Sequence, residues 1–317
     1  MAPVISDIYI YPIKSCKALK VTEADISKYG LAYDRVWQVI DPETSAVRTM
    51  RQLPPMTLVD QQIVGDELVV SVPGKTIRLP LYPKPENYEE RDAFVFKVPV
   101  KALDMGEEAA TFFTDYLGVP CRLVFKSPNH VRTVVEHTPN KDQLGFQAET
   151  GFADNFPILC LSHESVEWIN QSLDNPVSVL NFRPNIVLRG VSEPFEEDMW
   201  CKVKIEGTVY YFTCRCTRCD LPNVDPATGI KDKLQPQKTL QTIRRVDKGK
   251  VAKFFACVGI NVQPSVTEGA KIRVGDEIDV VQVWEGERKK TGLEGWVGSE
   301  SEQVEQAERL TAQTTEA

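Results

Sequence analysis

The chain has 317 residues, of which 42% are hydrophobic and 26% are charged, a composition typical of globular proteins with one or two domains. Its net charge of −8 and its lack of a long basic run argue against a nucleic-acid partner. No apolar run approaches the roughly 20 residues that span a bilayer, and the first residues lack the pattern of a signal peptide. We therefore expect no membrane span, a cytoplasmic location and few disulfides.

The first part of the chain predicts short strands. In residues 4–11, Ile8 and Ile10 alternate with tyrosines, which indicates a strand. Residues 36–49 predict two strands around a turn, and residues 67–81 predict a hairpin that turns at Pro73 and Gly74. Apolar residues then recur at helical spacing in 107–117, and Gly118 is suited to end that helix.

Residues 127–155 are polar and lack periodicity, which predicts a long connection that serves as a domain junction or an active-site lid. Strand patterns resume beyond it and are joined by few helices. Ser162 is a candidate N-cap for a helix over 162–173, and a short helix is expected after Pro236. The further strands are expected in 156–162, 185–190, 201–207, 208–216 and 271–284, the last pair turning at Gly275 and Asp276 and ending in a buried strand. The charged residues 285–317 predict a disordered tail or a frayed helix.

Three cysteines fall within six residues, at Cys214, Cys216 and Cys219. Structural zinc usually requires four ligands, and no second cysteine pair or nearby histidine follows, so the sequence disfavours zinc. An iron–sulfur cluster is disfavoured because it also needs four cysteines, and a thioredoxin-like pair because no helix start follows the strand. The other five cysteines are scattered singly and are expected to be small packing or surface residues.

Strand alternation separates the members of this cluster. A strand over 208–216 would place Cys214 and Cys216 on one face and Arg215 on the other. Cys219 would then lie in a loop directly after Arg218, whose charge favours a thiolate. Cys219 is therefore the strongest candidate for a reactive or metal-binding cysteine, and an unreactive loop cysteine is the alternative.

Four cations stand at boundaries between predicted loops and strands. Each is by itself compatible with a solvated surface charge. If they converge in the fold, they form an anion site suited to phosphate, because arginine offers two parallel donors and lysine a point charge. These residues are Lys14, Arg35, Arg183 and Arg218.

Two further stretches are interpreted as turns. The acidic run Glu196, Glu197 and Asp198 is expected to be a solvated turn and not an acid–base site. Residues 225–229 combine Asp, Pro and Gly at turn spacing, which predicts a loop after Cys219 with its glycine in the left-handed conformation.

Several segments together resemble the MOSC-domain proteins of the mitochondrial amidoxime-reducing component type. They occur in the family's order up to about residue 283, and NFRPN and the RC-x4-VDP-x-TG segment are the most specific. The others are YPIKSCKAL, DRVW, FADNFPILCLSHESV, EEDMW, QPQKTLQTIRR and KIRVGDEI. The resemblance implies a mainly β fold with a few helices (α+β). It would comprise a MOSC-associated β-rich domain in residues 1–125, a MOSC β-barrel in 126–284 and a polar acidic tail in 285–317.

The resemblance also implies a molybdenum cofactor, a pterin that carries a phosphate and a dithiolene that chelates the metal. Cys219 matches the family cysteine that ligates molybdenum, and is the implied catalytic residue. The implied cofactor-binding residues are Lys14, Ser15, Arg35, Asn155, Arg183, Thr217 and Arg218.

Two positions depart from the family pattern. Asn155 and Phe156 stand where small hydroxyl residues are usual, and Phe156 is expected to reshape the cofactor or substrate pocket. Asp220 follows the implied ligand cysteine, where an apolar residue is more usual, and its carboxylate is expected to disfavour anionic substrates and to alter the electrostatics of the metal.

The implied function is a molybdenum-dependent oxidoreductase that reduces N-hydroxylated or N-oxide small molecules by removing an oxygen atom with two electrons. The implied electron source is a cytochrome b5-type donor with its NADH-dependent reductase. Membrane-anchored relatives carry an N-terminal hydrophobic segment, whereas this chain begins almost at its first strand, so no attachment to the mitochondrial outer membrane is expected.

The alternative function is a non-redox sulfur-carrier or cofactor-binding protein, because MOSC domains as a class are also linked to sulfur handling. They are linked to pyridoxal-phosphate enzymes as well, so pyridoxal phosphate binding is a further expectation, although the chain lacks the aminotransferase-like domain of such fusions. A third alternative is an interaction module stabilised by zinc at the three clustered cysteines.

Overall fold

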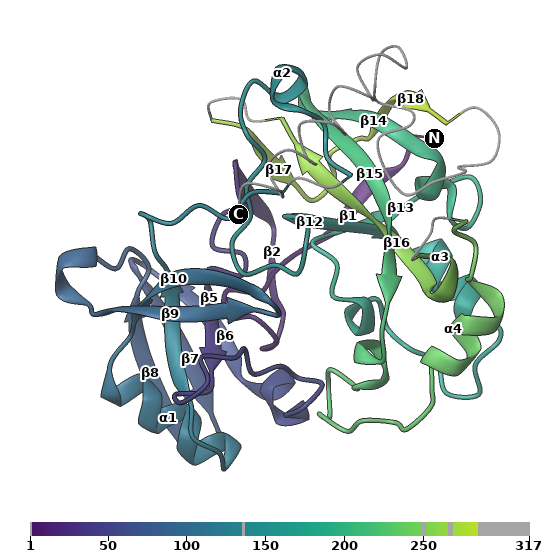
Figure 1. Cartoon of the computed structure of the whole chain (residues 1–317). Helices are drawn as coiled ribbons and strands as arrows, with labels where there is room; N and C mark the ends of the chain where they lie inside the picture. Colours follow the sequence, from purple (N-terminus) through teal and green to yellow (C-terminus); the bar gives the residue numbers. More distant parts are fainter. Residues whose placement is uncertain (1, 135–136, 249–251, 266–268, 285–317) are drawn as a thin grey trace, which may run out of the picture.

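The computed structural model describes residues 2–134, 137–248, 252–265 and 269–284, so the predicted tail in 285–317 lies outside the described residues. Within these ranges strands predominate and the helices are short, which confirms the expected mainly β class (Figure 1). No helix of the described part is long and apolar enough to cross a membrane. All eight cysteines are free thiols.

The largest sheet has eight strands and contains both the first strands of the chain and those of its second half. The first strand of the chain pairs antiparallel with residues 186–189, where Ile8 lies opposite Ile186, and both side chains enter the same apolar core. The sequence predicted a domain boundary near residue 125. This sheet contains strands from both sides of that boundary, because β1 and β2 pair into the sheet formed by the second half of the chain. The sheet order is β18 (Asp279–Val283), β14 (Trp200–Ile205), β15 (Thr208–Arg218), β16 (Ala256–Pro264), β12 (Ile158–Ser162), β13 (Ile186–Arg189), β1 (Val4–Ile10) and β2 (Leu19–Val21).

A second apolar core lies in the part of the molecule drawn at the lower left of Figure 1. There Phe113 of α1 (Glu107–Leu117) and Leu123 share a cluster with Trp37 and Val70. One sheet has the order β5 (Trp37–Ile40), β11 (Arg122–Lys126), β10 (Val98–Asp104) and β9 (Glu90–Val95), and a second has β6 (Asp60–Val64), β7 (Glu67–Val72) and β8 (Lys75–Pro80). A small sheet of β17 (Lys271–Arg273), β3 (Glu23–Ser27) and β4 (Gly30–Leu31) completes the set of sheets described.

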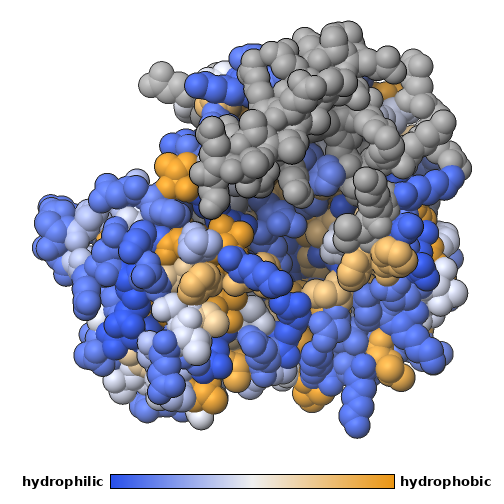
Figure 2. Space-filling view, viewed as in Figure 1, coloured by the Kyte–Doolittle hydropathy of each residue, from blue (hydrophilic) through white to orange (hydrophobic). Residues whose placement is uncertain are grey.

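The remaining helices are short. They are α2 (Lys141–Leu144), α3 (His163–Asn170) and α4 (Gln237–Ile243), with 3-10 turns η1 (Pro54–Leu58), η2 (Pro85–Asn87), η3 (Val179–Phe182), η4 (Glu196–Met199), η5 (Leu221–Asn223) and η6 (Ala252–Phe254). Ser162 caps α3 by accepting a hydrogen bond from the backbone of Ser165, and α1 ends at Gly118 with φ of 70°, both as predicted. On the face shown in Figure 2, hydrophilic residues predominate and hydrophobic ones are scattered among them.

Three local predictions were wrong in part. The second strand of residues 36–49 reduces to an isolated bridge at Val47, because β5 pairs with β11 instead. The final strand β18 is not buried: Val281 and Val283 are about half exposed, because β18 is the edge of its sheet. The connection 127–155 is less irregular than expected, since it contains α2 with a capping box.

Candidate functional site

Cys219 lies directly beyond the end of β15, as predicted. Its side chain is half-buried, and its sulfur accepts a hydrogen bond of 3.4 Å from the backbone N–H of Leu221 at the start of η5. The loop that follows has Gly229 in the left-handed conformation, with φ of 67°, which confirms the predicted turn. The structure thus presents a partly accessible thiol in the loop at this strand end.

The guanidinium of Arg218 is bound by the protein itself. It donates to the carbonyl oxygen of Val258 from Nε at 2.9 Å and from Nη2 at 2.6 Å, and to that of Phe182 from Nη1 at 2.9 Å. Arg218 therefore ties the end of β15 to β16 and η3 immediately before Cys219. It positions the cysteine, whereas the sequence suggested that it would face an anion.

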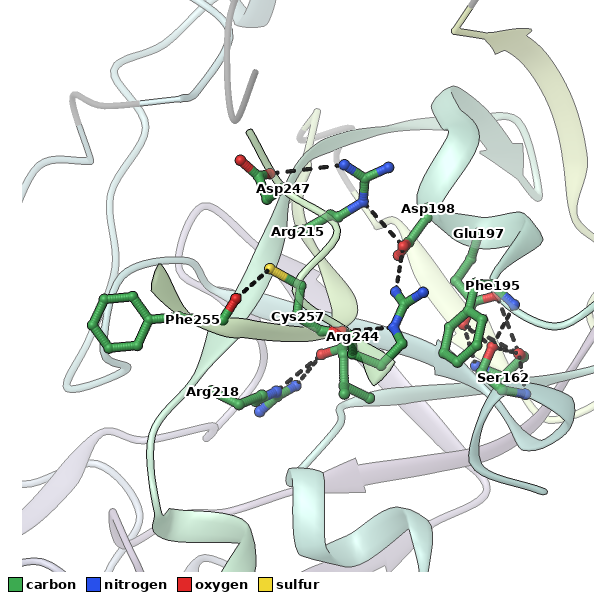
Figure 3. Close-up of polar contacts among 12 residues, drawn as sticks. Ser162, Phe195, Glu197, Asp198, Arg215, Arg218, Arg244, Asp247, Phe255 and Cys257 are labelled. Carbon is green, nitrogen blue, oxygen red and sulfur yellow. Dashed lines mark hydrogen bonds and ion pairs between the residues drawn. The ribbon is translucent and has the colours of Figure 1, made fainter. Parts of the chain in front are cut away.

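A network of buried charged side chains also joins β15 and β16 (Figure 3). Asp198 accepts hydrogen bonds from Arg215 at 3.0 Å and from Arg244 at 2.6 Å, and Arg244 also donates to the carbonyl oxygen of Cys257 at 2.9 Å. Arg215, which strand alternation predicts on the face opposite Cys214 and Cys216, is buried in this network, and the β15–β16 register is irregular on both sides of it. Cys214 is buried, and Cys216 is half-buried.

The acidic run 196–198 is not a solvated turn, which corrects the sequence interpretation. Glu197 is fully buried and accepts hydrogen bonds from Ser162 and Ser165 at the start of α3, the shortest being 2.7 Å from Ser165 Oγ. Burial and the neighbouring Asp198 raise the pKa of the Glu197 carboxyl to about 7. Glu197 thus contacts α3, and the adjacent Asp198 contacts Arg215 of β15.

Two of the predicted cations converge on one aromatic ring. The guanidinium carbons of Arg35 and Arg183 lie 4.2 and 4.1 Å from the centre of the Tyr11 ring. Arg35 Nη2 also donates to the carbonyl oxygen of Arg183 at 3.1 Å. Asp34 and Asn185 accept from Arg35 Nη1 at 2.5 and 2.8 Å, and this fixes its orientation. Sequence reasoning missed both acceptors, although each stands inside a matched segment, DRVW or NFRPN.

Three of the predicted cofactor residues have left-handed backbones although none is glycine. The φ angles are 70° at Ser15, 48° at Arg35 and 56° at Arg183. Such conformations cost on the order of 1–3 kcal/mol each and concentrate at functional sites, where the surrounding structure enforces them. Three of the nine non-glycine residues with positive φ in the described ranges are thus predicted cofactor residues, which supports a functional assignment for them.

Arg183 has a buried donor that is suited to an anionic ligand. Its side chain is about nine-tenths buried, and its Nη2 has no hydrogen-bond partner among the described residues. Burial lowers the pKa of this guanidinium to about 10, although the Tyr11 ring offsets part of the effect. A buried donor without an acceptor is costly, so a negatively charged group of a ligand would be stabilised here.

Lys14 has acceptors within the protein. Its Nζ donates to the carbonyl oxygen of Phe152 at 2.6 Å and forms an ion pair with Asp154. Burial lowers the pKa of Lys14, and the Asp154 charge opposes that effect. The sequence did not suggest Asp154, yet it stands beside Asn155 in the FADN segment. Asn155 and Thr217 are exposed residues.

Hydrogen bonds link these side chains to one another. Arg218, which precedes Cys219, donates to the carbonyl oxygen of Phe182, the residue before Arg183. Arg35 donates to the carbonyl oxygen of Arg183, and the carbonyl oxygen of Arg35 accepts from Phe152 N–H at 2.7 Å. Lys14 donates to the carbonyl oxygen of the same Phe152. Lys14, Arg35 and Arg183 are thus joined to the strand end that carries Cys219 by a continuous chain of contacts.

The structure gives the surroundings of both positions that depart from the family pattern. Phe156 is buried in an apolar cluster with Leu144 and Tyr211, so its ring packs in the core of that cluster. Asp220 Oδ2 lies 2.6 Å from the ammonium of Lys231, whose hydrogen bond lowers the pKa of Asp220 and whose positive charge pairs with the carboxylate. The carboxylate is therefore not an isolated negative charge beside Cys219.

The donor set fits the implied cofactor. No group of three or more His, Cys, Asp or Glu side chains suited to a metal ion occurs in the described ranges. A single thiolate at Cys219 suits a soft metal whose other ligands come from a chelating cofactor. The unpaired donor of Arg183 suits an anionic part of the same group.

Comparison with known proteins places these residues in a family. The family descriptions "MOSC N-terminal beta barrel domain" and "MOSC domain" match residues 2–120 and 147–279. The chain is 34% identical over 280 residues to mitochondrial amidoxime-reducing component 1 of Mus musculus, which covers 86% of this chain and 81% of that protein. It is 34% identical over 281 residues to mitochondrial amidoxime reducing component 2 of Rattus norvegicus, which covers 86% and 82%. Component 1 of Xenopus laevis is 33% identical over 283 residues, which covers 87% and 81%. The chain therefore belongs to the amidoxime-reducing component family of MOSC-domain proteins.

Proposed function

We propose that this protein is a molybdenum-cofactor oxidoreductase that reduces N-hydroxylated or N-oxide small molecules with electrons from an external donor. The observation that carries the proposal is the arrangement at the end of β15. A partly exposed Cys219 follows Arg218, which donates to the carbonyl oxygen of Phe182. The next residue, Arg183, is a buried cation whose Nη2 lacks an acceptor among the described residues. The relatives' printed name, amidoxime-reducing component, supports the class of reaction.

The residues have separate tasks in this proposal. Cys219 Sγ would provide one soft ligand, and Arg183 Nη2 would donate to an anionic group of the pterin. Arg35, Ser15 and Lys14 would form the rest of the cradle, and Asn155 and Thr217 would contact it from the exposed rim. The bound cofactor supplies the two-electron redox chemistry, while the protein supplies ligation, orientation and electrostatics.

Arg218 contributes by holding Cys219 in place. Its three hydrogen bonds to the carbonyl oxygens of Val258 and Phe182 join the strand end to two other elements. Arg244, which is paired with Asp198, likewise donates to the carbonyl oxygen of Cys257, the residue before Val258 in β16. Because these hydrogen bonds fix the backbone around Cys219, its thiol would need little rearrangement to ligate a metal.

The electron donor and the location belong to the same proposal. We propose a cytochrome b5-type protein and its NADH-dependent reductase as the donor chain, and a cytoplasmic site of action. The relatives are named mitochondrial, and fractionation of cells that express the full chain tests the cytoplasmic assignment. The findings give no support to pyridoxal phosphate binding, and we do not propose it.

Metal analysis tests the proposal directly. The full chain, produced in a host that makes the cofactor, is expected to carry near-stoichiometric molybdenum and to reduce benzamidoxime with dithionite-reduced methyl viologen as donor. Cys219→Ala is expected to lose both properties. Cys216→Ala is the matched control, because it removes a nearby thiol that is not assigned as a ligand.

The outcomes separate the alternatives. Wild-type protein without molybdenum would contradict the proposal. Protein that carries molybdenum and reduces none of several N-hydroxylated compounds would favour the non-redox cofactor-binding alternative. Stoichiometric zinc that is lost when Cys214 or Cys216 is replaced would favour the zinc-stabilised module.

A further inference from the structure

A cleft of about 450 Å³ opens beside the site just described. Val47, Arg51 and Phe96 line it from the first half of the chain, and Asp220 and Lys231 line it from the loop after Cys219. The cleft is thus formed where the two halves of the chain meet.

Two contacts connect this cleft with the proposed cofactor site. Asp220 is the residue next to Cys219 in the chain. The Phe96 ring centre lies 5.4 Å from Lys14 Nζ and 5.5 Å from the guanidinium carbon of Arg51. A molecule that occupied the cleft would therefore lie close to any group ligated by Cys219.

The charged side chains of the cleft do not balance. Lys231 Nζ contacts the Asp220 carboxylate at 2.6 Å and lies 3.4 Å from the carbonyl oxygen of Arg51. Two cations, Arg51 and Lys231, thus face one carboxylate, which leaves a net charge of about +1 in the cleft.

Phe96 supplies an apolar face in the same place. It stands at the turn between β9 and β10 with φ of 55°, a left-handed conformation that is unfavourable for a phenylalanine. Its side chain is about half exposed. An aromatic ring held in an unfavourable backbone conformation at the wall of a charged cleft is suited to stacking on a planar ligand.

We propose that this cleft binds the part of the substrate remote from the N–O group and selects planar aromatic substrates that carry a carboxylate. The ring would stack on Phe96, and Arg51 would donate to the carboxylate through its two parallel N–H groups. Lys231 removes the repulsion that Asp220 would otherwise exert. This inference rests on the proposed reductase function and adds its substrate class.

The selection is expected to act on substrate binding. The carboxylate lies away from the reacting group, so Arg51 contacts it equally in the ground and transition states and lowers KM without changing kcat. For a partly exposed charge pair we expect a preference of roughly tenfold in kcat/KM, which weakens as salt screens the charges.

The activity experiment compares three substrates with the cofactor-loaded full chain and a chemical reductant. We expect 4-carboxybenzamidoxime to exceed benzamidoxime about tenfold in kcat/KM, and 4-(aminomethyl)benzamidoxime to fall below it. Arg51→Gln is expected to bring the carboxylate preference close to one. Lys231→Met also exposes the charge of Asp220 and is expected to favour the aminomethyl compound.

Arg78→Gln is the matched control for these variants. Arg78 is an exposed arginine paired with Glu67 on a distant hairpin, so its replacement should leave the substrate preference unchanged. A binding measurement accompanies the kinetics: terephthalate, a planar and unreactive dicarboxylate, is titrated into the full chain by calorimetry. It should bind the wild type about tenfold more tightly than Arg51→Gln.

The results distinguish failure of the inference from failure of the function. Benzamidoxime reduction with no carboxylate preference, together with terephthalate binding unaffected by Arg51→Gln, would overturn the inference and leave the function intact. Arg51-dependent terephthalate binding by a protein that reduces no N-hydroxylated compound would support the cleft and reject the function. Loss of molybdenum from Arg51→Gln would assign the cleft to the cofactor and also overturn the inference.

Discussion

Arg244 Nη2 donates a hydrogen bond of 2.6 Å to Asp198, and both side chains are more than nine-tenths buried. Asp198 also accepts from Arg215, and Arg244 reaches the carbonyl oxygen of Cys257, so this pair joins η4, β15 and β16 (Figure 3). The strands that carry Cys219 are therefore held together by charge as well as by backbone pairing. Removing one partner would leave buried charge without compensation.

Asp198→Ala is accordingly expected to destabilise the fold strongly. Arg244 would lose its carboxylate, and Arg215 would keep Asp247 at 3.8 Å. Breaking a buried ion pair in this way costs about 3–5 kcal/mol. Urea denaturation followed by circular dichroism measures the loss. Asp92→Ala is the control, because Asp92 is exposed and its pair with Lys101 should contribute no more than about 1 kcal/mol. Equal losses in the two variants would contradict the assigned role of the network.

Glu197 predicts a pH dependence of stability. Burial raises the pKa of its carboxyl from 4.5 to about 7 in the folded protein, so the folded state retains a proton that the unfolded state has released. Stability from this group is thus highest below pH 4.5 and falls as pH rises to about 7, by roughly 3 kcal/mol.

Glu197→Gln should remove this loss. Between pH 5 and pH 8, the free energy of unfolding of the wild type is expected to fall relative to that of the variant. Denaturation midpoints at several pH values measure it, with the exposed Glu108→Gln as control. A difference that stays constant over this range would contradict the assignment to Glu197.

Arg183→Gln tests the unpaired donor. Nη2 has no partner within the described residues, so the replacement costs the cofactor-free chain mainly the cation–π contact with Tyr11, at most about 2 kcal/mol. Retention of molybdenum after gel filtration should fall by at least about tenfold, because an anionic group loses a buried donor. Arg189→Gln, an exposed arginine on β13, should retain the metal. Full metal content in Arg183→Gln would exclude a role for Nη2.

Gly151→Ala tests the packing around Arg35. A Cβ at Gly151 would lie 2.7 Å from the carbonyl oxygen of Arg35, too close for either backbone segment to remain in place. We expect a stability loss of about 1–3 kcal/mol and reduced molybdenum content. Gly74→Ala is the control: its Cβ enters open space at a left-handed turn, so it shows backbone strain alone and should not affect the metal. Unchanged metal content in Gly151→Ala would contradict a role for Arg35 in binding the cofactor.

Prediction from sequence succeeded where neighbours along the chain decide the outcome. The end of α1 at Gly118 depends on glycine's access to the left-handed conformation. The cap of α3 at Ser162 depends on a hydroxyl three residues before a free N–H. The position of Cys219 beyond its strand follows from the length of the alternating segment.

Prediction failed where distant segments decide it. Arg183 and Arg218 look alike in sequence, each standing at a loop–strand boundary. The structure binds Arg218 to the carbonyl oxygens of Val258 and Phe182 and leaves Nη2 of Arg183 without an acceptor in the described part of the chain. Asp220 seemed to add a negative charge beside the cysteine until the fold brought Lys231 to it.

The sequence by itself determined the mainly β class, the strand-then-loop setting of Cys219 and the set of cations near it, because alternation, turn residues and residue chemistry are local properties. Only the tertiary structure decided which cation supports the cysteine and which remains available to a ligand. It also decided that Glu197 and Asp198 are buried and that Arg51, Phe96 and Lys231 form one cleft. These outcomes depend on which distant backbone carbonyls and carboxylates the strand pairing brings within hydrogen-bond distance.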